Sequence, residues 1–156
     1  DVFRIHSEDG TLEKTCTVRS REIAEPRHFV FHPSGVWCYG VNEKDYSVTA
    51  YQFDTASGTL APRQILPTLP DTYTGDGWAS GIVMMPDGRH VVVSNCIKTG
   101  GGQPRFITVS PWGTILAANE TTDLVTEFTL DTETGAFKST GWNLATESPV
   151  CLTFRT

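Results

Sequence analysis

Four charged or titratable residues stand at the ends of short strand-like segments, where side chains from separate parts of a chain can meet. These residues are Arg27, His28, Glu43 and Arg105. An arginine fork binds two oxygens of a carboxylate or phosphate at once, and it can stabilise an oxyanion. A carboxylate or a neutral imidazole can take a proton from water. Together these residue types predict a site that binds a small anion and activates water.

Each of these residues also has a structural interpretation, and the sequence leaves both open. Arg27 and Arg105 can clamp neighbouring strands by donating to backbone carbonyls. His28 can be a satisfied interior histidine, and Glu43 can be a solvated acid in a turn. Trp78 either packs between sheets or lines the mouth of a substrate pocket.

Two sequence phrases recur along the chain and predict the elements that position these residues. A strand, a Pro-x-Gly turn and a second strand occur at 26–42, 79–95 and 104–119. A strand ending at a glycine turn occurs at 3–12, 51–60 and 128–137. Proline presets φ for such turns, and glycine permits positive φ. Joined, the phrases make a four-stranded antiparallel unit, whose repetition indicates an all-β fold, a β-propeller.

The spacing of the units indicates that one of them is incomplete. Only a glycine-rich connection separates the segment ending at Asn95 from the strand at 104–109. Two strands and a turn, roughly 20 residues of a blade, are missing there. We expect residues 1–156 to be part of a single propeller domain. Its approximate units are 1–20 (the end of a blade), 26–68, 79–102 (incomplete), 103–145 and 146–156 (a closing strand).

The number of blades bounds the architecture. At roughly 40–50 residues per blade, 156 residues supply three to four blades. A closed ring needs at least four blades, and an open arc would expose a sheet edge and the faces of its blades. We therefore expect either a part of a larger propeller or a sequence from which loops are omitted. A ring completed by a second chain is the less favoured alternative, and the sequence does not indicate an oligomeric state.

Specific phrases carry a family resemblance. Residues 25–33, Glu-Pro-Arg-His-Phe-Val-Phe-His-Pro, followed by Val-Asn-Glu at 41–43, resemble the propeller lactonase family, which includes bacterial propeller-type 6-phosphogluconolactonases. The phrases at 78–79, 85–90, 103–106 and 148–151 extend the match over essentially the whole chain, which corresponds to the C-terminal half of the family. The resemblance implies a seven-bladed propeller whose last strand, here 149–154, pairs with the first blade. It also implies hydrolysis of a sugar lactone without a cofactor.

The resemblance implies roles for individual residues as well. In a sister branch that forms or opens a lactone from carboxymuconate, positions proposed as substrate anchor and acid/base fall on Arg27 and Glu43. We expect Arg27 to bind the anionic group or the oxyanion, with Glu43 or His28 assisting the water. Arg105 and Trp78 are expected to bind substrate.

Two positions depart from the family pattern and keep alternatives open. Another arginine of the muconate branch falls at Cys96, and an acid common in phosphogluconolactonases falls at Gly81. A carboxymuconate-type lactonizing enzyme is one alternative, because the fold does not determine the substrate or the direction of the reaction. The other is a non-catalytic propeller that presents a binding surface, because two charged positions are lost.

The composition argues against several classes of partner and site. There are 12 Lys and Arg against 18 Asp and Glu, a net charge of −6, which argues against nucleic acid and anionic lipid as partners. No apolar run of about 18 residues predicts a membrane span. The four cysteines are far apart, which favours free thiols in a cytoplasmic protein over disulfides or a metal site. We expect a cytoplasmic enzyme of carbohydrate metabolism that acts on a small anionic lactone or sugar acid.

Overall fold

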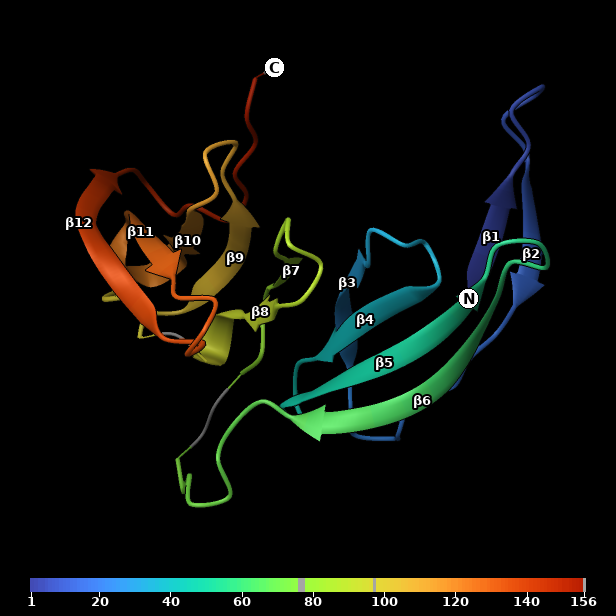
Figure 1. Ribbon diagram of the computed structural model, residues 1–156, viewed down its shortest axis with the longest axis horizontal. Coiled ribbons are helices and arrows are strands. Elements are labelled where there is room, and N and C mark those ends of the chain that lie inside the picture. The colour runs from blue at the N-terminus through green and yellow to red at the C-terminus, as the bar shows by residue number, and fades with distance from the viewer. Residues whose placement is uncertain (76–77, 97, 156) are drawn as a thin grey trace.

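The structure, a computed structural model, describes residues 1–75, 78–96 and 98–155, without the side chain of Cys96. The described residues form antiparallel strands and two single-turn 3₁₀ helices, with no α-helix among them (Figure 1). The first six strands are β1 (Val2–Ile5), β2 (Leu12–Cys16), β3 (Pro26–Phe31), β4 (Trp37–Asn42), β5 (Ser47–Asp54) and β6 (Thr59–Pro67). The other six are β7 (Ile82–Met84), β8 (Val91–Val93), β9 (Pro104–Val109), β10 (Ile115–Asn119), β11 (Leu124–Leu130) and β12 (Phe137–Ala145). The 3₁₀ helices are η1 (Ser94–Cys96) and η2 (Glu120–Thr122).

The strands make four sheets, each a simple meander. Strands β3 to β6 form one four-stranded sheet, and β9 to β12 form another. Strands β1 and β2 form a two-stranded sheet, as do β7 and β8. The unit between the two complete sheets therefore has only its first two strands in the described chain, which confirms the prediction of an incomplete unit. The hairpin β1–β2 corresponds to the outer pair of a blade, because its sequence phrase is shared with β5–β6 and β11–β12.

The hairpin turns are made as the residue types predict. Gly58 and Gly135, which close the turns after β5 and β11, have φ values of 69° and 72°. Only glycine adopts this left-handed conformation without strain. Ahead of each glycine, the carboxylate of Asp54 or Asp131 accepts backbone N–H groups of its own turn. The same turn chemistry thus sets the register of both outer hairpins.

Packing places the short sheet β7–β8 between the two complete sheets, as Figure 1 shows. On one side, Val41 and Ala79 pack with Ile82 and Val93 in a buried cluster. On the other side, a second cluster joins the β7–β8 unit to the sheet of β9 to β12 through buried apolar side chains: Met85, Val92, Ile107, Ile115, Ala117 and Phe128. The first strands of the three units, β3, β7 and β9, are consecutive neighbours as a result. Residues at the start of these strands are therefore brought together, which is the arrangement of inner strands in a propeller.

The C-terminal segment differs from the expectation. Residues 146–155 contain no strand, although a closing strand was expected within 146–156. A closing strand needs a partner, and the blade with which it would pair is not among the four sheets described. Phe154 instead packs edge-on against Trp112, with ring centroids 5.6 Å apart. Closure of a ring through this segment stays a prediction.

Candidate active site

A row of alternating charges runs along the start of the inner strands. The Nε atom of Arg27 lies 3.7 Å from Oε1 of Glu43, and the same oxygen lies 3.8 Å from Nη1 of Arg105. Arg105 in turn places its Nε atom 3.1 Å from Oε2 of Glu120. We call these four residues the charge row. Their side chains are between 16% and 33% exposed, so the row is partly shielded from water but open on one side.

The two arginine–glutamate pairs of the charge row share one backbone arrangement. Arg27 and Arg105 are the second residues of β3 and β9, and each glutamate directly follows the second strand of its sheet. The backbone N–H of Glu43 donates to the carbonyl of Glu25 at 2.9 Å, and that of Glu120 donates to the carbonyl of Gln103 at 3.1 Å. In both blades the accepting residue lies two positions before the arginine, so each glutamate is tied to the strand that carries its partner.

The two accepting residues share an uncommon conformation. Glu25 has a φ of 48° and Gln103 a φ of 52°, in the left-handed region that residues with a side chain rarely adopt. A proline follows each of them and begins the inner strand. The same turn therefore delivers an arginine to the same place in both blades.

Arg27 also acts as a clamp across three blades. Its Nη1 atom donates to the backbone carbonyl of Ser80 at 2.7 Å and to that of Arg105 at 3.2 Å. Ser80 holds the place in the middle unit that Arg27 and Arg105 hold in theirs. The Nη1 atom of Arg27 thus makes the contacts to backbone carbonyls that its structural interpretation predicts. Its Nη2 atom meets no hydrogen-bond partner within the described residues.

Arg105 is the more open of the two arginines. Both contacts of its side chain are ion pairs, and that side chain is 33% exposed. Within the described residues no hydrogen bond uses its Nη2 atom. A guanidinium held through Nε and Nη1 with a free nitrogen can bind an incoming oxyanion or carboxylate.

His28 is partly buried beside Arg27. Partial burial, followed by the positive charge of Arg27, lowers the pKa of His28 below its ordinary value of 6.5, although the Ser80 carbonyl and Glu43 act in the opposite direction. Its Nδ1 atom lies 3.2 Å from Nη1 of Arg27. Because a guanidinium only donates, this contact is a hydrogen bond in the tautomer that carries the ring proton on Nε2. In that tautomer Arg27 occupies the accepting nitrogen of His28, whereas the carboxylate of Glu43 can accept a proton from water.

Glu120 was missed by the sequence analysis, although a signal for it exists. Asn119-Glu120 repeats Asn42-Glu43 at the end of the second strand, and both asparagines are buried. The corresponding residue of the middle unit is Cys96, whose side chain lies outside the described part of the structure. Arg105 reaches Glu43 from two units away. Glu43 therefore has a second arginine beside it, although Cys96 stands where the muconate branch has an arginine.

Gly81 lies close to the backbone of a neighbouring sheet. A Cβ atom at this position would lie 3.0 Å from the backbone nitrogen of Ile107 and 2.9 Å from its Cγ1 atom. A side chain at this position would therefore require β9 or the segment of Gly81 to shift.

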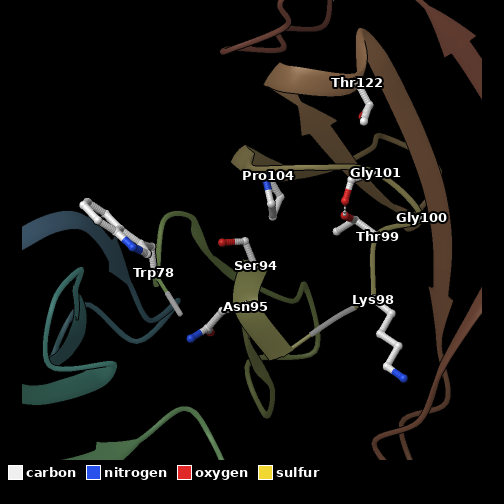
Figure 2. Close-up of a pocket in the computed structure, with 9 residues that line it drawn as sticks. All are labelled: Trp78, Ser94, Asn95, Lys98, Thr99, Gly100, Gly101, Pro104 and Thr122. Carbon is white, nitrogen blue, oxygen red and sulfur yellow. Dashed lines mark hydrogen bonds between the residues drawn. The ribbon is translucent and has the colours of Figure 1, made fainter. Parts of the chain in front are cut away.

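Trp78 lies beside the charge row rather than within it. Its side chain is exposed, at 59% for the residue, and it lines an open pocket of about 490 Å³. Figure 2 shows Trp78 on one side of this pocket and the loop that carries Lys98 on the other, with Ser94 and Pro104 between them. Pro104 directly precedes Arg105, and the N–H of Ala79 donates to the carbonyl of Glu43 at 3.2 Å. The pocket thus adjoins the charge row, while a role of Trp78 in binding stays a prediction.

Within the described ranges, no three His, Cys, Asp or Glu side chains are grouped so that they could hold a metal ion. The same part of the chain has no helix with the length and apolar character needed to cross a membrane.

Comparison with known proteins decides the family. A family model described as "Lactonase, 7-bladed beta-propeller" matches residues 1–98 and 96–154. The chain belongs to this lactonase family. The two matched segments overlap at 96–98, in the connection from β8 to β9, and no strand lies between β8 and β9 in the described chain.

Two relatives of this chain are named 6-phosphogluconolactonase. The protein of Klebsiella pneumoniae is 37% identical over 113 residues, which are 71% of this chain and 33% of the relative. The protein of Bacillus subtilis is 27% identical over 176 positions, covering 98% of this chain and 50% of the relative. That alignment is longer than the 156 residues of this chain, so the relative carries residues that are lacking here. The chain spans a third to a half of the length of these relatives.

Solved structures show the same fold. The periplasmic gluconolactonase PpgL of Pseudomonas aeruginosa superposes with a TM-score of 0.83 at 21% identity, over 99% of this chain and 50% of that one. A protein of Lactobacillus plantarum superposes with a TM-score of 0.84 at 22% identity, over 96% of this chain and 50% of that one. The chain thus has the fold of about half of such a β-propeller.

Proposed function

We propose that this lactonase chain is part of an enzyme that hydrolyses a sugar lactone, and that the charge row is its reaction site. The observation that carries the proposal is Glu43, a partly buried carboxylate between the guanidinium groups of Arg27 and Arg105. Family membership supports the reaction class, because the relatives named above are lactonases. The substrate we propose is a small anionic sugar lactone.

In the proposed reaction, Glu43 accepts a proton from a water molecule whose oxygen attacks the lactone carbonyl carbon. The carbonyl oxygen becomes negatively charged, and the free Nη2 atoms of Arg27 and Arg105 stabilise it or hold the anionic group of the substrate. The bond between this carbon and the ring oxygen then breaks. The departing oxygen takes back the proton from Glu43, which leaves an open sugar acid and regenerates the carboxylate.

The other candidate residues have supporting roles in this proposal. His28 contacts Nη1 of Arg27 through its Nδ1 atom and so helps to orient the arginine rather than the water. Trp78 supplies an exposed aromatic face next to Pro104, on which a sugar ring can pack. No step of this mechanism requires a metal or an organic cofactor. The cytoplasmic location stays a prediction.

The test is the rate of acid release from glucono-δ-lactone and 6-phosphogluconolactone, corrected for spontaneous hydrolysis. Glu43→Gln retains the size of the side chain but cannot accept the proton, so the turnover is expected to fall by about 10²- to 10⁴-fold. Glu13→Gln is the matched control, because Glu13 is an exposed carboxylate paired with His6 on the β1–β2 hairpin. Its turnover should equal that of the unchanged protein.

Different outcomes would favour the two alternatives. Turnover that is unaffected by both Glu43→Gln and Arg27→Ala would reject the charge row and favour a non-catalytic propeller. Interconversion of a lactone with carboxymuconate, followed by the absorbance of the muconate, would instead indicate the lactonizing reaction.

A further inference from the structure

Glu120 makes the shortest ion pair of the charge row and has no part in the mechanism above. Its Oε2 atom lies 3.1 Å from Nε of Arg105, whereas the contacts of Glu43 are 3.7 and 3.8 Å long. Both partners are about one-third exposed, so the pair lies at the border of the site and not on the open surface.

The backbone holds Glu120 firmly relative to Arg105. Glu120 begins η2, and its N–H donates to the carbonyl of Gln103, two residues before the arginine. The next N–H, that of Thr121, donates to the backbone carbonyl of Gly102 at 3.4 Å. The carboxylate is therefore carried by a turn that is tied to the same strand end as its partner.

Contact with Glu120 determines which edge of the guanidinium is available. Arg105 has a long, flexible side chain, and the loss of its rotamer freedom on binding an anion weakens that binding. Glu120 engages Nε, which leaves Nη1 toward Glu43 and Nη2 without a hydrogen-bond partner among the residues described. An arginine oriented in this way beforehand presents its free nitrogen next to the carboxylate proposed as the base.

We propose that Glu120 is a positioning residue, which holds Arg105 in the orientation that binds the anionic group or the oxyanion of the lactone. This inference rests on the proposed function of the charge row. The repeat supports it, because Glu120 stands to Arg105 as Glu43 stands to Arg27. Glu43 thus serves as the base, whereas Glu120, at the equivalent position, orients Arg105.

The first test is a kinetic comparison of Glu120→Gln with the unchanged protein. Loss of the charge loosens Arg105, so KM is expected to rise about tenfold, as for a weakened charge-assisted contact. The value of kcat should change less than about threefold, because Glu43 is untouched. Glu120→Asp keeps the charge and should recover most of the lost affinity. Glu13→Gln is the control, and an unchanged KM in Glu120→Gln would overturn the proposal.

The second test does not depend on turnover. Phenylglyoxal modifies accessible arginines, and the modification of Arg105 can be followed by mass spectrometry of its peptide. Release from Glu120 should make Arg105 react several-fold faster in Glu120→Gln than in the unchanged protein and in Glu13→Gln. Equal rates would overturn the positioning role. If the unchanged protein opens no lactone, the proposed function fails, whereas this labelling still decides whether Glu120 holds Arg105.

Discussion

The guanidinium of Arg27 donates to the backbone carbonyl of Ser80 at 2.7 Å, and Ser80 occupies in the middle unit the place that Arg27 occupies in its own. A second bond from the same nitrogen reaches the carbonyl of Arg105, the equivalent residue of the unit after that. One side chain therefore connects equivalent points of three successive inner strands. Arg27 and Arg105 share a place in the repeat, but Arg27 alone of the two donates side-chain hydrogen bonds to backbone carbonyls of other units among the described residues.

Arg27 and Arg105 should accordingly differ in their effect on stability. Arg27→Ala removes bonds from a charged donor to two carbonyls and should lower the free energy of unfolding by about 2 kcal/mol. Arg105→Ala removes only partly exposed ion pairs and should cost less than about 1 kcal/mol, while raising KM. Urea unfolding of the two variants checks this difference. Equal losses of stability would mean that the carbonyl bonds of Arg27 do not form in solution.

His28 should make the protein less stable in acid. Its pKa is lowered in the folded protein by burial and by Arg27, whereas the unfolded chain has the ordinary value of 6.5. As the pH falls through 6.5 toward the folded value, the unfolded chain binds a proton that the folded protein does not. This contribution to stability is therefore complete above pH 6.5 and is lost below it. In urea unfolding between pH 7 and pH 5, His28→Asn should lose less stability than the unchanged protein. His6→Asn, at an exposed site, is the control, and identical slopes for His28→Asn and the unchanged protein would contradict the argument.

Cys38 should be unreactive in the folded protein. Its side chain is fully buried, and burial raises the pKa of the thiol to about 11. A thiol of this pKa has roughly 100-fold less thiolate at pH 7 than an ordinary cysteine. Iodoacetamide followed by peptide mass spectrometry should modify the exposed Cys151 and spare Cys38 until urea is added. Equal labelling of both thiols without urea would contradict the packing around β4.

Gly81 should not tolerate a side chain. The alanine methyl group of Gly81→Ala would press on the backbone nitrogen of Ile107, which cannot move without shifting β9. We expect a loss of about 1–3 kcal/mol in the free energy of unfolding, as for other overpacked sites. Chemical denaturation measures this loss, and an unchanged midpoint would show that β7 and β9 lie further apart.

Much of the architecture was predictable because its signals are local. Pro-x-Gly turns and short runs of Val, Ile and Phe placed Arg27 and Arg105 at the start of inner strands, where the structure has them. The shortened spacing after Asn95 predicted the two-stranded middle unit. Proximity of Glu43 to both arginines followed from the idea that units of a propeller converge.

The remaining features depend on distances between units, which no local pattern contains. Whether Nη1 of Arg27 reaches the carbonyl of Ser80 depends on the rotation from one unit to the next. The crowding at Gly81 has the same origin, because Ile107 belongs to another sheet. Glu120 could have been found from the repeated Asn-Glu pair. Its contact with Arg105 additionally requires the backbone tie to Gln103.

The two-stranded middle sheet has a consequence for self-association. In the complete sheets, the second strand bonds to a third, whereas β8 has no partner other than β7 within the described chain. Its residues, Val91 to Val93, carry no charge or proline that would repel an approaching strand. An uncharged β-branched edge of this kind templates the addition of extended polypeptide. Aggregation on concentration or mild heating should therefore begin at this edge.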